Sequence, residues 1–439
     1  MIYFLSFEKN DRSIKKMNKL NKKTKTIIIA AVIAVVAIIV CISHFKKPGR
    51  IDGFESAVTS IDNIRIPEGT RIVALGEATH GNAEFQELKR DVLEVLVNNS
   101  NVRALVLEGD FGGCCLVNDY IQGGEGDPKE LVNHLGYRIY RTQQMYDLIE
   151  WMRQYNETAE DGDKIRLYGM DIQKDTDDKV YIENLYERLD AGKYADYSAR
   201  MDTLLGDSYD TYDASKYDEI IALMDEIEGD LTDNFDAYAG VTSNEEVQRA
   251  RIAAGVIRYF MDLELNTTNY HKFRDTAMKE LVDRILALEE KEYGSAIMIG
   301  CHNGHMTENN SSNFTYLGSF LNESYGDSYF TIGTDYYYTS DNLPGTSGRT
   351  VERFCSDDPL AYQVGSMPEN RYYIDFSTVD PKSAVGKMIN RSISTGSLGE
   401  DYNITYKFVK AYHQLNYAPT DMYDAMILYY EVNPTEIWE

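Results

Sequence analysis

The chain has 439 residues, of which 43% are hydrophobic and 26% charged, so it is long enough to bury a large core and is not disordered overall. Its formal net charge of −27 is unevenly spread: residues 1–50 carry 11 Lys/Arg and 2 Asp/Glu, whereas residues 51–439 carry 33 Lys/Arg and 69 Asp/Glu. A body with that acidic excess repels phosphate backbones, so nucleic-acid binding is disfavoured.

The N-terminal segment has the pattern of a membrane anchor. Residues 27–42 carry no charged side chain, and with their neighbours they reach about 20 residues, the length that crosses a bilayer. Basic residues precede this run, which places the N-terminus in the cytoplasm. We predict a basic cytoplasmic segment at 1–26, a transmembrane signal anchor at 27–45 and a linker at 46–53. A cleaved signal peptide is the alternative, and Met17 is an alternative translation start.

Seven apolar runs in the body predict the strands of a buried sheet. Their nearly continuous hydrophobic character is typical of parallel strands that are covered on both faces. Between the first two runs, Phe85, Leu88 and Val92 fall at helical spacing. The predicted strands are Arg71–Leu75, Arg103–Leu107, Lys164–Tyr168, Ala296–Ile299, Tyr329–Ile332, Tyr372–Phe376 and Met426–Tyr430.

The alternation of strands and amphipathic helices predicts an α/β fold with a mainly parallel central sheet flanked by helices. Residues from about 175 to 270 interrupt this alternation, because they are acidic, rich in tyrosine and lack a convincing strand. We interpret them as a helical insertion. The predicted catalytic domain spans residues 54–439 and lies outside the cytoplasm, tethered to the cell membrane by a single span.

The five cysteines do not form a disulfide pattern. Cys41 lies in the apolar run, Cys114 and Cys115 are adjacent, and Cys301 and Cys355 stand alone. No pair has the spacing of a zinc site, so buried free thiols are the favoured interpretation.

Ionisable residues follow four of the predicted strands. The carboxyl ends of parallel strands lie at one edge of a sheet, where α/β proteins place their sites. One of these residues taken alone, such as Asp110 or Asp171, is equally well explained as a helix N-cap, and a single histidine is more often structural. The joint occurrence favours a common cleft that contains Glu77, His80, Glu108, Asp110, Asp171, His302 and His305.

These residue types suit acid–base hydrolysis. The sequence has no G-x-S-x-G motif, and no Ser or Cys accompanies the histidines in a nucleophile motif. His80 beside carboxylates fits a general base that activates water. His302 or His305 fits a donor that stabilises an oxyanion or protonates a leaving alcohol. The same side chains also suit a divalent transition metal, which stays open as an alternative.

An ordered series of motifs resembles the erythromycin esterase family. It comprises GEATHGNAEF, LEGDF, WMRQYN, YGMDIQ, RD-x-x-M and CHNGH, and the resemblance covers roughly residue 51 to the C-terminus. The resemblance implies an α/β core with a helical insertion and a deep cleft. It also implies a metal-independent histidine that activates water to open a lactone ring, without a cofactor. That base corresponds to His80, with Glu77 and Glu108 beside it and His302 and His305 on the facing wall.

Two departures separate the chain from the macrolide-hydrolysing members. These members have an arginine nine residues after the catalytic histidine, where this chain has Lys89, which lacks the planar fork of arginine. We expect Lys89, Asp171 and Asp110 to contact substrate, although a surface position is an equally good interpretation of Lys89. The membrane anchor is the second departure, since the resistance enzymes are cytoplasmic.

The leading hypothesis is therefore a hydrolase of a small-molecule carboxylic ester or lactone, with macrolides among the candidate substrates. A metal-dependent hydrolase of envelope esters or peptides is the first alternative. A surface protein that binds haem or another ligand is the second. No nucleic-acid partner is expected, and the oligomeric state is left open.

Overall fold

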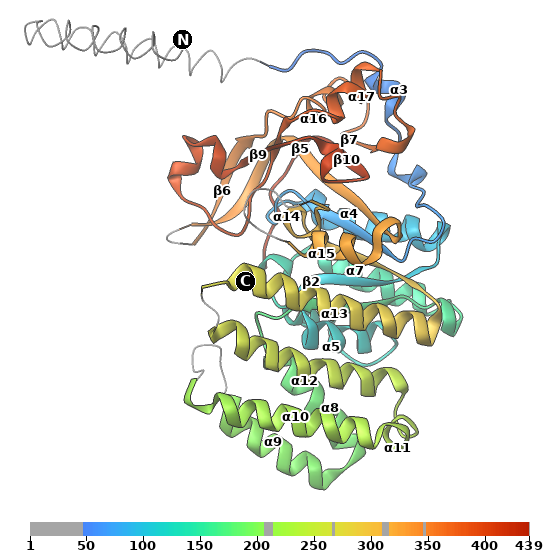
Figure 1. The fold of residues 1–439 in the computed structure, drawn as a ribbon, viewed down its shortest axis with the longest axis vertical. Coiled ribbons are helices and arrows are strands. Elements are labelled where there is room, and N and C mark those ends of the chain that lie inside the picture. The colour runs from blue at the N-terminus through green and yellow to red at the C-terminus, as the bar shows by residue number, and fades with distance from the viewer. Residues whose placement is uncertain (1–46, 206–213, 266–267, 310–315, 346–347, 439) are drawn as a thin grey trace, which may run out of the picture. The chain divides into compact units, whose positions relative to one another are not determined.

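A sheet of eight strands forms the centre of the fold (Figure 1). Seven strands follow the order β3-β2-β4-β1-β5-β10-β7, and β6 pairs with the far end of β5. All neighbours from β3 to β10 run parallel, whereas β7 is antiparallel to β10. The strands are β1 Ile72–Glu77, β2 Val102–Asp110, β3 Arg166–Asp171, β4 Ala296–His302, β5 Tyr329–Gly345, β6 Gly348–Cys355, β7 Arg371–Asp375 and β10 Ala425–Val432; β8 Ile393–Gly396 and β9 Gln414–Tyr417 form a separate antiparallel pair.

This computed structural model describes residues 47–205, 214–265, 268–309, 316–345 and 348–438. The predicted cytoplasmic segment 1–26 and signal anchor 27–45 lie outside the described residues. Within the described residues, no helix combines the length and the apolar character that a membrane span needs. Residues from Arg50 onward pack as one unit.

Alternating side chains of the central strands enter two hydrophobic cores, one on each face of the sheet. Ile72 and Ala74 of β1 belong to one core, and Val73 and Leu75 belong to the other. This is the period-two pattern of a strand that is buried on both sides. The prediction of an α/β fold with a mainly parallel sheet is thereby confirmed.

Helices cover both faces of this sheet. Phe85, Leu88 and Val92 of α4 pack into the core that contains Val73, together with residues of α7. The opposite core takes residues from α8, α12 and α13. The helices are α3 Phe54–Ala57, α4 Ala83–Asn99, α5 Phe111–Ile121, α6 Pro128–Leu131, α7 Gln143–Asn156, α8 Thr176–Leu189, α9 Ala191–Leu205, α10 Tyr217–Asp233, α11 Phe235–Ala239, α12 Asn244–Leu265, α13 Tyr270–Tyr293, α14 Asn303–Met306, α15 Leu317–Tyr325, α16 Ala361–Val364 and α17 Ala384–Ile389.

The described residues between β3 and β4 form α8 to α13. Helix α8 packs on α5, and α12 packs on both α8 and α13. Figure 1 shows α9, α10 and α11 beyond α12, farther from the sheet than α13. This helical layer places α13 between the insertion and the sheet, so that the first residues of α13 lie near the ends of β2 and β3.

The seven predicted strands are present, but three further strands, β6, β8 and β9, were not predicted. β6, β8 and β9 are short or half-exposed and mix polar with apolar residues, so they give no continuous hydrophobic run. β5 continues well past Ile332 because its second half alternates buried and half-buried residues. The predicted run, Tyr329–Ile332, covers only the first part of the fully buried stretch, which continues to Tyr337 through the polar residues Thr334 and Asp335.

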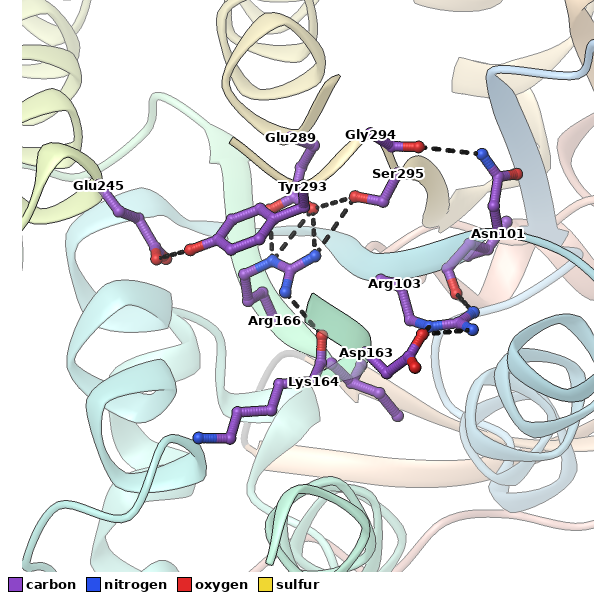
Figure 2. Close-up of polar contacts among 12 residues, drawn as sticks. Asn101, Arg103, Asp163, Lys164, Arg166, Glu245, Glu289, Tyr293, Gly294 and Ser295 are labelled. Atoms are coloured by element: carbon purple, nitrogen blue, oxygen red, sulfur yellow. Dashed lines mark hydrogen bonds and ion pairs between the residues drawn. The ribbon is translucent and has the colours of Figure 1, made fainter. Parts of the chain in front are cut away.

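A buried ion-pair network joins β3 to the end of α13 (Figure 2). Nε and Nη2 of Arg166 each donate to Glu289 at 2.7 Å, and the hydroxyls of Tyr168 and Ser295 donate to the same carboxylate at 2.6 Å. The Arg166 guanidinium lies 3.6 Å from the centre of the Tyr293 ring. Because both charged groups are buried away from water, each is stabilised mainly by the opposite charge of the other.

Among the described cysteines, Cys114, Cys115 and Cys301 are free and buried, as expected, whereas Cys355 is free and half-buried. Burial raises the pKa of the Cys301 thiol well above its ordinary value, which keeps it protonated and poorly nucleophilic.

Candidate active site

The four predicted strand ends meet at one edge of the sheet. Glu77 is the last residue of β1 and lies in register with His302, the last residue of β4. Asp110 and Asp171, the last residues of β2 and β3, are likewise neighbours. The parallel topology therefore brings together side chains that are far apart in the sequence, as predicted.

A cavity of about 440 Å³ opens at this edge. Four of the predicted residues line it directly, and the remaining lining residues come from the segment before α7, from the loop after β3, from α13 and from the loop after β8. The lining residues are His80, Glu108, Tyr137, Arg138, Ile139, Tyr140, Gln173, His271, Arg274, His302, His305, Gly399 and Glu400.

His80 is held by a buried ion pair behind it. Its Nδ1 lies 2.8 Å from Oε1 of Glu77, and Nζ of Lys89 donates to the other oxygen of that carboxylate at 2.6 Å. Gly81 permits this turn by its size, because a Cβ at that position would come within 2.1 Å of an Asp341 carboxylate oxygen. The Glu77 carboxylate therefore fixes the orientation of the His80 ring.

The charges around His80 set its protonation. Burial raises the pKa of Glu77, but the charge of Lys89 and the hydrogen bond with His80 outweigh this and lower it to about 2. Glu77 is thus ionised and accepts the proton on Nδ1. Burial lowers the pKa of His80, but the hydrogen bond to Glu77 and its charge outweigh burial, so the pKa is raised. In the neutral ring, Nε2 keeps a free lone pair.

His302 presents the complementary group. Its Nδ1 accepts the backbone N–H of Gly304 at 3.1 Å, so the proton of the neutral ring is on Nε2. Burial and then the charge on His80 lower the pKa of His302 to about 4, which keeps it neutral at neutral pH. Nε2 is buried and has no partner among the described residues. The ring centres of His80 and His302 are 5.0 Å apart and both rings line the cavity, so a base and a donor lie next to each other on its wall.

The facing wall is built around Arg274 at the start of α13. Its guanidinium donates to both oxygens of Asp171, at 2.8 and 2.6 Å, and to Oε1 of Glu108 at 2.8 Å. The second oxygen of Glu108 accepts the backbone N–H of His302 at 2.9 Å. Arg274 therefore neutralises two buried carboxylates and links the ends of β2 and β3, and Glu108 links β2 to β4.

His305 lies between two carboxylates on this wall. Its Nδ1 is 2.6 Å from Asp275, and its Nε2 is 3.3 Å from Glu108. Burial lowers the pKa of His305 and Arg274, 3.1 Å from Nε2, also opposes protonation, but the charge of Glu108 and the hydrogen bond to Asp275 raise it to about 10. His305 is therefore a cation beside the cavity at neutral pH.

Replacing Asp275 by Asn should lower the pKa of His305, because one of its two carboxylate partners is lost. The raised pKa stabilises the fold fully below about pH 6.5, the ordinary value of histidine, and this contribution fades as pH rises toward 10. The wild type should therefore lose more stability between pH 7 and 10 than Asp275→Asn. Histidine NMR titration and urea unfolding at both pH values measure these two effects, and equal slopes would contradict the assignment.

Three predicted substrate contacts are placed behind the cavity instead of on its surface. Lys89 is 2% exposed and bound to Glu77, and Asp171 is bound to Arg274. Asp110 caps α5 by accepting the Gly113 N–H at 2.7 Å, and burial and the charge of Asp177 raise its pKa to about 7. Their contacts are with protein groups because each is buried beneath the lining residues.

Several residues of this site lay outside the prediction. Arg274 and Asp275 occur in the RD-x-x-M motif, but nothing in the local sequence indicates that α13 enters the cleft. Glu400 reaches the cavity from a distant loop, where the Leu398 N–H donates to the carbonyl of Ala78. Only the tertiary structure reveals these contributions.

In the comparisons with known proteins, residues 97–432 match the family model described as erythromycin esterase. That range includes Glu108, Arg274, His302 and His305 and begins after His80. Erythromycin esterase type II of Escherichia coli is 30% identical over 105 residues, which span 24% of this chain and 24% of that protein.

Solved structures share the fold at low sequence identity. A succinoglycan biosynthesis protein superposes with a TM-score of 0.71 at 18% identity, covering 88% of this chain and 97% of that one. A mutant of the erythromycin esterase EreC in its open conformation gives a TM-score of 0.59 at 14% identity, covering 85% and 93% of the two chains. Since the family model spans most of the chain, the protein belongs to the erythromycin esterase family.

Proposed function

We propose that this protein hydrolyses a carboxylic ester or lactone by direct attack of water, with His80 as the general base. The observation that carries the proposal is the pairing of two histidines in opposite roles. Nδ1 of His80 is bound to an ionised Glu77, and Nε2 of His302 is a buried donor without a partner among the described residues.

In the proposed reaction, Nε2 of His80 takes a proton from water as the oxygen adds to the carbonyl carbon. The negative charge of Glu77 stabilises the imidazolium that forms. General-base assistance of this kind contributes about 10²–10⁴-fold in rate. The imidazolium then returns the proton to the leaving alkoxide, so that an acid and an alcohol are released.

The oxyanion of the tetrahedral intermediate needs a donor that is already in place. His302 fits this role, because its Nε2–H is fixed by the hydrogen bond at Nδ1 and loses no partner when substrate arrives. A donor of this kind is typically worth about 3–4 kcal/mol in the transition state. The His305 cation adds favourable electrostatics from the same wall.

The metal-dependent alternative requires carboxylates that are free to bind a metal ion. No group of three His, Cys, Asp or Glu side chains within the described ranges has the geometry to hold a metal ion. Glu77 is occupied by Lys89 and His80, and Glu108 by Arg274 and the His302 N–H. The proposed mechanism uses protein groups alone, and the response of turnover to a chelator distinguishes it from the metal-dependent alternative.

Family membership supports a small-molecule ester as substrate, and macrolides are the first candidates to examine. The apolar run at 27–42 and the basic residues before it support a membrane-anchored enzyme with the domain outside the cytoplasm. In that location, neutral esters of the envelope are equally accessible substrates.

The test is turnover by the purified full-length protein on macrolides, simple lactones and alkyl esters, with and without a chelator. Mass spectrometry should detect the gain of one water on a cyclic substrate, or an acid and an alcohol from a linear one. The rate should not depend on the chelator. Loss of turnover in chelator with recovery on Zn²⁺ would support the metal-dependent alternative, and a co-purifying ligand without turnover would support a binding protein.

A further inference from the structure

An exposed apolar patch lies beside β6. Within the described residues, eight large hydrophobic side chains are exposed, and five of them occur between residues 404 and 415. Figure 1 shows the segment after residue 400 next to β6, and the ion pair between Lys407 and Glu352 joins the two. We call this surface the apolar patch; it consists of Ile404, Phe408, Val409, Tyr412 and Leu415.

This clustering is unusual for a surface on an otherwise strongly acidic body. Phe408 is 79% exposed, and an exposed aromatic ring among aliphatic side chains indicates a contact surface. The rings of Tyr406 and Tyr412 stack with their centres 5.1 Å apart. This contact joins the two short helical turns that carry the patch. The patch is therefore presented on an ordered segment.

The carboxylates at the border of the patch are neutralised. Glu352 pairs with Lys407, and Asp357 pairs with Lys410. Glu400 forms a two-pronged ion pair with Arg349, at 2.8 and 3.0 Å. These three carboxylates are thus paired with cations, and Asp401 at the same border accepts a hydrogen bond from the Tyr406 hydroxyl. The pairing makes this face less acidic than the rest of the body.

The chain also restricts what can reach the patch. The predicted anchor ends at residue 45, and the first helix of the described residues, α3, begins at Phe54. The linker, residues 46–53, spans at most about 30 Å when fully extended. A domain on that tether stays close to the bilayer that holds the anchor, and aromatic and aliphatic side chains bordered by lysines suit the headgroup boundary.

We propose that the apolar patch docks on the surface of a phospholipid bilayer. The proposal rests on the anchor expected from the sequence and does not depend on the ester hydrolase proposal. Gly399 and Glu400 line the cavity and precede the patch directly in the chain. Docking therefore brings one wall of the cavity to the membrane interface.

The test uses the full-length protein in nanodiscs of phosphatidylcholine and phosphatidylglycerol. Spin labels are attached at Phe408→Cys or Ile404→Cys, and the matched control is Val241→Cys, which replaces a 66% exposed aliphatic residue just after α11. Cys41 and Cys355 are replaced by Ser in every variant, whereas the buried thiols of Cys114, Cys115 and Cys301, whose pKa values burial raises, are not labelled.

Collision with oxygen, which concentrates in lipid, is compared with collision with a water-soluble nickel chelate. Labels at 404 and 408 should favour oxygen severalfold over the label at 241, and adding Phe408→Asp to the 404 variant should remove that preference. Equal accessibility at all three positions would overturn the proposal. Dipolar coupling between labels on two copies, without a depth signal, would overturn it in favour of self-association.

Discussion

Replacing His80 by Asn should lower kcat/KM on the substrate ester by about 10²–10⁴-fold, the range that general-base assistance contributes. Asparagine retains a hydrogen-bonding group beside Glu77 but has no basic nitrogen with which to accept a proton from water. The fold should persist, because the sheet and both cores do not involve this side chain. Steady-state kinetics together with thermal unfolding measure the two effects.

The matched control is His134→Asn, which makes the same chemical change outside the cavity lining. His134 is partly exposed and contacts Asp177, and it should retain full activity. Comparable losses of activity in the two variants would mean that replacing any histidine by asparagine disturbs the protein. An unchanged rate in His80→Asn would mean that another residue is the base.

Replacing Glu289 by Ala should lower the free energy of unfolding by about 3–5 kcal/mol, because the buried Arg166 guanidinium is left without a counter-charge. The hydroxyls of Tyr168 and Ser295 lose their acceptor in the same step. Urea or guanidinium denaturation with a fixed m-value gives this difference directly.

Glu290→Ala is the natural comparison, since it removes the next glutamate in the same helix. Glu290 pairs with Arg71 at the surface, and its side chain is 37% exposed, so the expected loss is at most about 1 kcal/mol. Losses of equal size in the two variants would show that burial of the Arg166–Glu289 pair does not determine its contribution.

The sequence predicted the sheet because its central strands are buried on both faces. Runs such as residues 72–75 and 296–299 must be continuously apolar to face two cores, and that pattern is visible without a structure. The edge strand β6 faces solvent on one side, so its residues mix charge and hydrophobicity and give no such signal.

The sequence predicted those site residues that lie at or near the ends of parallel strands. Glu77 and His302 are the last residues of β1 and β4, and Glu108 lies two residues before the end of β2, so the parallel topology brings them to the same edge. Arg274 and Glu400 reach the same cavity from a helix end and from a loop, where only packing decides the direction of the side chain. Lys89 was expected to contact substrate, but its ammonium group forms an ion pair with Glu77 and lies behind His80.

The most direct test is the pH dependence of kcat/KM for the wild type and for Glu77→Gln on the same ester. A general base must be unprotonated, so activity rises with pH through the pKa of His80, which Glu77 raises above the ordinary value of about 6.5. The double variant Glu77→Gln/Lys89→Met keeps the buried charges balanced and serves as the control for folding.

We expect the acid limb of the wild-type profile to lie above pH 6.5 and to move to lower pH in both variants, with a reduced plateau. An acid limb at the same pH in all three proteins would contradict the assignment of His80, held by Glu77, as the base that activates water.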